Sequence, residues 1–283
     1  MHCKLTKFRL TRVRVSITVL LVFLHIPFTL ANLNSSTNKN HYLPTPSADK
    51  QWQKIEGLSD EFNGNSLDNK KWDPRHPFWN GRDSVFTESN VSVAKGNLRL
   101  KSTLLNSNEE VSAKNVTSAI ISSKQSNVGP GYYEARIKAS DLSMTSSFWF
   151  QGTYSEIDVI ENIGRPVNAD SLKFESVMRI NTHYYPDGWD KDINTPLDKE
   201  LAIKVRDNFH TYGVWWREDN TTWYYFDGKK VGELTHGGAF KESMYMYFDT
   251  EVFHWHGWPT KESLLNPNKN TMLVDWVRAW QLK

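Results

Sequence analysis

Cysteine is almost absent from this chain of 283 residues, and a long apolar run occurs only once. The single cysteine, Cys3, precedes that run, and residues 1–14 carry five basic side chains and no acid. A basic start followed by an apolar stretch and a small residue predicts a secretory signal peptide over residues 1–31. The alternative is an uncleaved membrane anchor, but His25 and Pro27 interrupt the run, which is short for a span.

Cleavage near Ala31 would leave no thiol and no disulfide, so packing alone must stabilise the mature protein. It would also remove five of 34 basic residues, leaving 34 − 5 = 29 against 32 acidic residues. The basic pI of the whole chain is therefore no argument for a nucleic-acid partner or, after processing, for a membrane partner. We expect a secreted protein, extracellular or periplasmic, that acts as a monomer.

The rest of the chain divides into a short polar segment and one long globular part. Residues 32–50 are polar and contain two prolines, which predicts a disordered linker. Residues 51–283 suit one large β domain as well as two small ones, and no internal repeat or break in composition marks a second boundary.

Helical periodicity is scarce in this domain, whereas short β-like runs with turn signals recur. Residues 91–102 predict two strands around a Lys95-Gly96-Asn97 turn, and residues 222–234 predict a hairpin closed at Asp227-Gly228. Only "TKESLLNP" suggests one short helical turn. The pattern favours an all-β fold, a sandwich of two antiparallel sheets with one face left as an open cleft. The 12 Trp, 11 Tyr and 14 Phe exceed what such a core needs, and exposed rings can stack on sugars.

The stretch "YSEIDVIEN", residues 154–162, places three carboxylates among strong strand formers. Alternation in a strand puts Glu156 and Asp158 on one face, with Tyr154 beside them, but sends Glu161 toward the core. An unpaired carboxylate is costly there, so we predict a one-residue bulge near Val159 that returns Glu161 to the cleft face. The two glutamates would then lie close enough for a retaining glycosidase, with Asp158 between them as a helper. A solvated acidic edge strand is the alternative.

"EIDVIE" resembles the bulged Glu-x-Asp-x-x-Glu signature of glycoside hydrolase family 16. The chain is similar to the branch of that family that cleaves red-algal galactans, the β-agarases and β-porphyranases, over residues 51–283. The resemblance implies a jelly-roll β-sandwich in which Glu156 is the nucleophile, Glu161 the acid/base and Asp158 their helper. It implies no cofactor for catalysis.

Further residues are candidates for substrate binding. The resemblance implies that His183 bonds the sugar near the cleavage point, and that Trp79 and Arg82 supply a stacking platform and a cation. Residues with less support are Trp149, which suits the cleft or the core equally, Tyr154, Arg179 with Asn181, and Glu251.

Two patterns raise the question of a metal. The His-x-His of "HWHGW", residues 254–258, has a metal-like spacing, but no third ligand is evident and we interpret it as loop structure. The family resemblance implies a structural calcium held by Asp275 and the carbonyl of Gly96, although Asp275 could equally pair with a nearby base.

The sequence thus predicts a secreted, endo-acting, retaining glycoside hydrolase that cleaves β-1,4 links in a red-algal galactan, with porphyran favoured over agarose. A lectin-like binding module on the same sandwich is the alternative from another class. It is disfavoured because a pure binder has no need of both glutamates.

Overall fold

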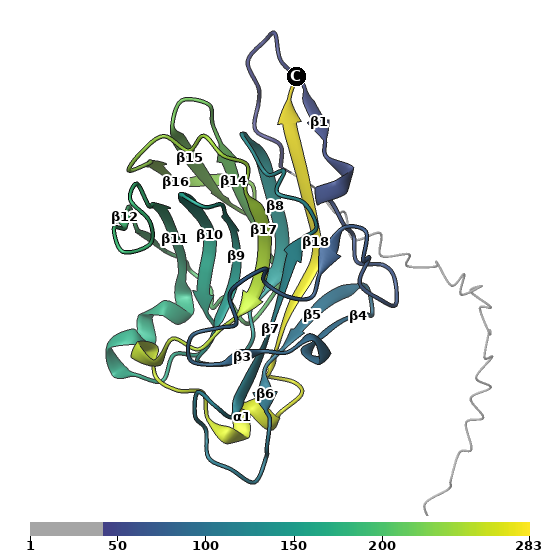
Figure 1. Cartoon of the computed structure of the whole chain (residues 1–283), viewed down its shortest axis with the longest axis vertical. Coiled ribbons are helices and arrows are strands. Elements are labelled where there is room, and N and C mark those ends of the chain that lie inside the picture. The colour runs from purple at the N-terminus through teal and green to yellow at the C-terminus, as the bar shows by residue number, and fades with distance from the viewer. Residues whose placement is uncertain (1–41) are drawn as a thin grey trace, which may run out of the picture. The chain divides into compact units, whose positions relative to one another are not determined.

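The computed structural model describes residues 42–283, so the predicted signal peptide and the first part of the predicted linker lie outside the described residues. Figure 1 shows two stacked layers of strands with few helices. Within residues 42–283, no helix has both the length and the apolar character needed to cross a membrane.

The first layer is an eight-stranded sheet, in which seven strands follow one another in order and the eighth pairs with one of them outside this order. Its order is β16 (Lys229–Thr235), β15 (Thr221–Phe226), β14 (His210–Trp216), β8 (Gly131–Lys138), β18 (Thr271–Leu282), β5 (Asn97–Lys101) and β4 (Val91–Ala94), with β1 (Trp52–Lys54) paired to β18. Its strand pairs are all antiparallel within residues 42–283.

The second layer is a ten-stranded sheet that carries the acidic strand at its centre. Its order is β12 (Ile193–Asn194), β11 (Val177–Tyr184), β10 (Ser155–Ile163), β9 (Thr145–Gln151), β17 (Tyr245–Thr250), β7 (Val116–Ser123) and β2 (Trp72–Asp73). Outside this path, β13 (Leu197–Glu200) pairs with β11, while β3 (Val85–Phe86) and β6 (Thr103–Leu104) pair with β7. Only the two-residue β3–β7 pair is parallel among the described strands, so the predicted antiparallel sandwich is confirmed.

In the described part of the chain, helical structure is limited to short pieces between the strands. These are α1 (Lys261–Leu265) and the 3₁₀ turns η1 (Glu56–Leu58), η2 (Glu88–Asn90), η3 (Ala169–Ser176) and η4 (His254–His256). The predicted single helical turn is therefore confirmed as α1. Thr260 caps it, because its side-chain oxygen accepts a hydrogen bond from the amide of Ser263 at 3.2 Å.

Both predicted hairpin turns are present. Asp227 and Gly228 join β15 to β16 with φ of 45° and 77°, the left-handed conformation that a tight two-residue hairpin requires. Lys95 and Gly96, between β4 and β5, have φ of 56° and 72°.

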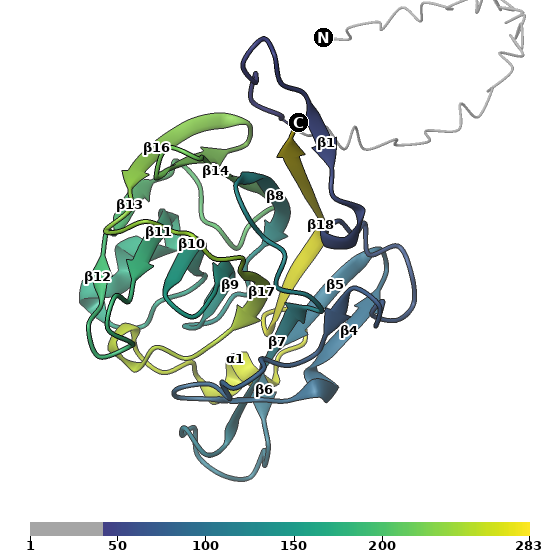
Figure 2. The ribbon, with the colours of Figure 1, turned by 45° about the horizontal axis from the view of Figure 1, so that its top comes forward.

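The main core lies between the two sheets. Ile157 and Phe148 of the ten-stranded sheet and Tyr133 and Val277 of the eight-stranded sheet are fully buried in one cluster. Each such side chain contributes roughly 1.5–3 kcal/mol by leaving water, which compensates for the missing disulfides. Figure 2 shows the strands of both layers from a second direction.

Part of the aromatic excess lies outside this core. Tyr132, Trp215, Tyr225 and Trp280 form a separate buried cluster of the eight-stranded sheet. Residues 42–50 have no regular secondary structure, but Leu43 packs against this cluster and the indole of Trp52 donates a 2.7 Å hydrogen bond to the carbonyl of Pro44. This described part of the predicted linker therefore has defined contacts with the sheet.

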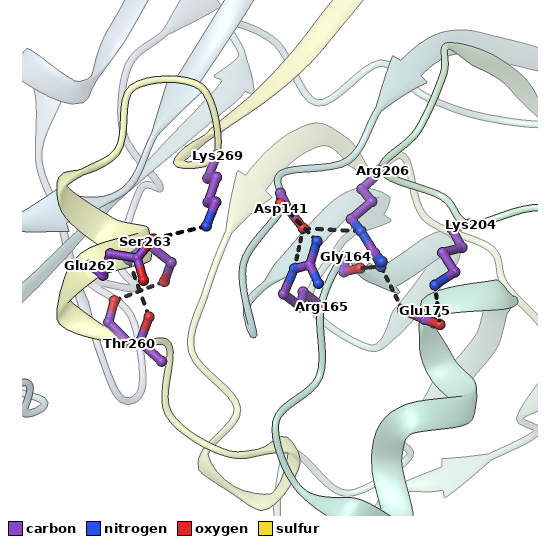
Figure 3. A network of polar contacts seen from close by, with 10 residues as sticks. All are labelled: Asp141, Gly164, Arg165, Glu175, Lys204, Arg206, Thr260, Glu262, Ser263 and Lys269. Carbon is purple, nitrogen blue, oxygen red and sulfur yellow. Dashed lines mark hydrogen bonds and ion pairs between the residues drawn. The ribbon is translucent and has the colours of Figure 1, made fainter.

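A polar network fixes the chain where β10 ends. Arg206 donates to the carbonyl of Gly164 at 2.6 Å and to Glu175 at 2.7 Å, and its Nε lies 3.0 Å from Asp141 (Figure 3). Lys204 and Arg165 add an ion pair each, to Glu175 and to Asp141. The network holds the segment that follows the acidic strand at a defined position.

Candidate active site

The acidic strand β10 contains the predicted bulge. Asp158 pairs with Trp149 of β9, but the next pair joins Ile160 to Phe148, so Val159 is the extra residue. Ile157, Val159 and Ile160 are fully buried, whereas Glu156, Asp158 and Glu161 all line the same cleft. The prediction that the bulge returns Glu161 to the cleft face is confirmed.

The cleft has a volume of about 670 Å³ and a mixed acidic and aromatic lining. Its floor is formed by β9, β10, β11 and β17, and loop residues complete its walls. Four aromatic side chains in it, Phe78, Trp79, Trp189 and Trp255, are each more than 40% exposed. Such rings offer apolar faces to a ligand that also needs hydrogen bonds.

Glu156 is held by neighbours on both flanking strands. Gln151 on β9 donates from Nε2 to Oε2 of Glu156, and the hydroxyl of Tyr185 donates to the same oxygen at 3.2 Å. Oε1 lies 3.9 Å from Nε2 of His183, which is directly opposite on β11. Oε2 is thus held by two donors, whereas Oε1 accepts neither of these hydrogen bonds.

His183 is the cation at the centre of the acidic group. Its Nε2 lies 3.3 Å from Asp158, and its Nδ1 lies 2.8 Å from Asp192. Burial alone would lower the pKa of His183, but Asp158, Glu156 and Asp192 raise it to about 10. The three carboxylates therefore favour the imidazolium form of His183 at neutral pH. Atoms of Glu156, Asp158 and His183 lie within 4.8 Å of one another, as metal ligands can, but here the imidazolium already supplies the positive charge.

Comparison with known proteins identifies the family. A model described as the GH16 domain of β-porphyranases A–D matches residues 52–282, nearly all of the described chain. The chain belongs to this family. It is therefore a glycoside hydrolase, and the resemblance seen in the sequence is confirmed.

Similar proteins are found among curated sequences and solved structures. Similar curated proteins include β-porphyranase E of Zobellia galactanivorans, 34% identical over 82% of this chain and 88% of that protein, and β-porphyranase B of Phocaeicola plebeius, 33% identical over 85% and 88%. The β-porphyranase BpGH16B of the human gut bacterium Bacteroides plebeius has a TM-score of 0.76 at 32% identity, covering 86% of this chain and 96% of that one. β-Agarase A of Zobellia galactanivorans has the same TM-score at 22% identity, which shows the common fold.

Charge crowding sets the protonation of the two glutamates in this family member. Burial, then repulsion from Asp158 and Glu251, raises the pKa of Glu161 to about 7, although Arg179 and His183 oppose the shift. Burial and Asp158 also raise the pKa of Glu156, while His183 and the bond from Gln151 lower it. Glu161 thus has the proton that an acid needs near neutral pH.

Most of the substrate-binding candidates predicted from the sequence lie in the cleft. Trp79, Arg82, Trp149, Asn181, His183 and Glu251 all line it. Trp149, which the sequence left between core and cleft, stacks on Tyr247 at 4.4 Å on the cleft floor. The amide of Arg82 donates to Glu251, and its guanidinium lies 5.4 Å from the ring centre of Trp255.

Tyr154 and Arg179 do not line the cleft. Tyr154 precedes β10 in a turn, where its amide donates to Glu242 at 2.6 Å and its side chain is 55% exposed. Arg179 is bound elsewhere, 2.8 Å from Nε2 of His256 and over the ring of Phe174. Arg179 still lies on the same side of β11 as Asn181 and His183, and its charge lowers the pKa of Glu161. A role for Tyr154 or Arg179 in substrate binding stays a prediction.

Sequence reasoning missed several residues of the cleft. Ser147 and Gln151 have the strand parity of Trp149 and could have been found by that signal. The others come from loops or from a strand whose face was not assigned, and they are His76, Phe78, Tyr185, Trp189, Asp192, Asp249, Phe253 and Trp255.

The two metal questions have different outcomes. In "HWHGW", Nδ1 of His254 lies 2.7 Å from Asp83, while His256 bonds Ser171 at 2.9 Å and Arg179, so each imidazole has its own protein partners. This agrees with the interpretation as loop structure.

The predicted calcium ligands are Asp275 and the carbonyl of Gly96. Strand pairing brings their segments together, since Val274 pairs with Leu98 close to the Gly96 turn. Asp275 is bound by Arg136 at 2.7 Å, the pairing that the sequence left open. Nearby, the buried Oδ1 of Asn97 has no hydrogen-bond partner among residues 42–283, which suits an oxygen-lined cation site. A cation there would have to share Asp275 with Arg136.

Proposed function

We propose that the protein is a retaining endo-glycoside hydrolase that cleaves β-1,4 links in a red-algal galactan, and that porphyran is its preferred substrate. The observation that carries this proposal is the bulged strand, which presents Glu156 and Glu161 on one face of an aromatic-lined cleft.

In the first step, Asp158 takes up the proton that it shares with Glu156, and Oε1 of the ionised Glu156 attacks the anomeric carbon while Oε2 is held by Gln151 and Tyr185. The glycosidic C–O bond breaks, and Glu161 gives its proton to the leaving oxygen. In the second step, Glu161 takes a proton from water, the water oxygen attacks the anomeric carbon, and Glu156 is released as a carboxylate.

Asp158 and His183 maintain the charge balance during these steps. When Glu156 is consumed as the ester, one negative charge leaves the group, and the imidazolium of His183 remains paired with Asp158 and Asp192. We propose that Asp158 positions His183 and shares a proton with Glu156 when the cleft is empty.

Arg82 supports the preference for porphyran, whose L-galactose-6-sulfate units replace the anhydro-sugar of agarose. It is the only lysine or arginine in the cleft lining formed by the described residues. A guanidinium bonds two oxygens of a sulfate at once, and the adjacent Trp255 and Trp79 offer faces for the sugar ring. Similar proteins are named β-porphyranases, which also supports porphyran as the substrate.

The decisive experiment is a reducing-sugar assay of the full protein on porphyran, agarose, κ-carrageenan and laminarin. We expect the highest kcat/KM on porphyran. Faster cleavage of pure agarose would make the protein a β-agarase, and binding without any release of reducing ends would favour the lectin-like alternative.

We further propose that the protein is exported and that residues 1–31 are removed. Mass spectrometry of the exported protein should then find an N-terminus near Asn32. An intact Met1 in a soluble extracellular product would contradict this proposal.

A structural calcium at Gly96 and Asp275 is a separate proposal, supported by the unpartnered Oδ1 of Asn97. A ligand that binds only the folded state raises its stability. Chelation should therefore lower Tm without abolishing activity at low temperature, and an unchanged Tm would count against the site.

A further inference from the structure

Two loops that are far apart in the sequence meet over the cleft. Phe78 belongs to the loop after β2, and Trp189 belongs to the loop between β11 and β12. Their ring centroids are 6.4 Å apart at an interplanar angle of 77°, which is an edge-to-face contact. Both side chains line the cleft, and both are more than half exposed.

The two loops start from different sides of the cleft floor. On one side, His76 stacks 4.6 Å from Tyr247 of β17 and 6.0 Å from Trp149 of β9, and its edge meets Phe78 at 4.6 Å. On the other side, Tyr185 stacks 5.9 Å from His183 of β11 and 4.8 Å from Trp189. Since β9 and β10 lie between β17 and β11, the Phe78–Trp189 contact crosses above them.

The contacts form a closed circuit of side chains around the part of the cleft next to Glu156. From Trp189 it passes through Tyr185 and His183 to the floor, where Glu156 is bonded to Gln151. From Gln151 it returns along β9 to Trp149 and then through His76 and Phe78. The half of the cleft next to Glu161, with Arg82, Trp79 and Trp255, lies outside this circuit.

The loop that carries Phe78 and the loop that carries Trp189 are each held by further hydrogen bonds. Nδ1 of His76 accepts hydrogen bonds from the amides of Phe78 at 3.3 Å and Trp79 at 3.0 Å. Burial lowers the pKa of His76 to about 4, so the ring stays neutral and able to accept. The other loop is held by the His183–Asp192 contact at 2.8 Å and the Lys191–Asp187 bond at 2.7 Å.

We propose that Phe78 and Trp189 form a bridge that encloses the substrate chain beside the nucleophile, so that the enzyme cuts one chain several times before releasing it. The inference rests on the proposed retaining mechanism, because the part of the chain bound covalently to Glu156 is then the enclosed part. The leaving part lies toward Glu161, outside the bridge, and departs freely. The retained end can advance and be cut again.

The test compares the fall in viscosity of a polysaccharide solution with the number of new reducing ends. Repeated cuts in one chain release many reducing ends for a small fall in viscosity, whereas random cuts lower viscosity early. Phe78→Ala and Trp189→Ala should increase the viscosity fall per bond cut by about two- to tenfold, the range expected from losing one aromatic pair. Trp189→Phe should keep the viscosity fall per bond cut close to the wild-type value, because a ring still reaches Phe78.

Trp255→Ala is the matched control, since Trp255 is also an exposed ring of the cleft but contacts Arg82 instead of the bridge. It should raise KM without changing the viscosity fall per bond. If the wild type is active and both alanine variants show the same viscosity fall per bond cut as the wild type, the bridge is overturned and the proposed function is left intact. A protein that cleaves none of the four polysaccharides would overturn the proposed function and the bridge with it.

Discussion

Two groups of acidic residues next to the same strand, β10, are neutralised to very different degrees. Where β10 ends, Asp141 and Glu175 face Arg206, Arg165 and Lys204 in the network of Figure 3. On the cleft face of β10, Glu156 and Asp158 lie 3.9 Å and 3.3 Å from His183, while the charges of Arg179 and His183 lower the pKa of Glu161 without offsetting its rise.

The protonation of the two groups follows from this difference. Burial opposes ionisation of Glu175, yet Lys204 and Arg206 lower its pKa below the usual range. Burial and neighbouring carboxylates instead raise the pKa of Glu161 to about 7. The first group holds the strand in place, and the second keeps a proton available for transfer. Five predictions test this contrast, in decreasing order of expected effect.

Removing the nucleophile should have the largest effect. Glu156→Gln should lower kcat by between about 10⁴- and 10⁶-fold, as loss of a nucleophile does in other covalent enzymes, while Tm stays near or above the wild-type value. Azide should restore turnover to Glu156→Ala and yield an α-glycosyl azide. Near-full activity of Glu156→Gln in the reducing-sugar assay would disprove the assignment.

Removing the proton donor should have the next largest effect. Glu161→Gln should lower kcat/KM by about 10²- to 10⁴-fold, the usual contribution of general acid catalysis. In the wild type, kcat/KM should fall as pH rises through about 7, because Glu161 then loses its proton. A wild-type rate that stays constant from pH 6 to about pH 9 would contradict this role.

Breaking the neutralised group should affect stability instead of chemistry. The side chain of Arg206 is 7% exposed, so Arg206→Met leaves Asp141 and Glu175 without a buried partner. Asp141 and Glu175 keep Arg165 and Lys204, so we expect a loss of about 1.5–3 kcal/mol in the free energy of unfolding, measured in denaturant, from the hydrogen bonds that the charged Arg206 makes. Arg165→Met is the control: its side chain is 51% exposed and its ion pair to Asp141 should contribute less than about 1 kcal/mol. Equal losses in both variants would show that burial does not matter.

The sequence was most informative about the regular backbone structure, that is, the strands, the bulge and the turns. Alternation along β10, and the cost of burying Glu161, were enough to predict the bulge at Val159. The turn at Asp227-Gly228 followed from residues that tolerate positive φ.

What could not be predicted depends on contacts between distant segments. The Phe78–Trp189 contact joins two loops without a periodic pattern, so no local rule brings them together. The contacts of Tyr154 and Arg179 could not be predicted for a related reason, since their partners Glu242 and His256 are far away in the sequence. Such pairings require the complete fold.

The fourth prediction concerns the only arginine of the cleft lining among the described residues. A charge-assisted hydrogen bond contributes roughly 1.5–3 kcal/mol, so Arg82→Ala should lower kcat/KM on the sulfated unit by about ten- to a hundredfold. The loss on neutral agarose segments should be smaller. Equal losses on both substrates would mean that Arg82 supports the loop through Glu251 instead of binding sulfate.

The last prediction is a gain of stability where function is lost. The pKa of Glu161 is about 7 in the folded protein against 4.5 as the ordinary value, so its contribution to stability is present below pH 4.5 and disappears as pH rises through 7. The full difference corresponds to roughly 3 kcal/mol, and water in the open cleft reduces this to about 1–2 kcal/mol. Glu161→Gln should therefore be more stable than the wild type at about pH 8 and no more stable at about pH 4.5. Glu262→Gln is the control, because the side chain of Glu262 is 79% exposed, pairs with Lys269 and does not line the cleft. A stability gain for Glu161→Gln that is equal at both pH values would show that the gain does not come from the charge of Glu161.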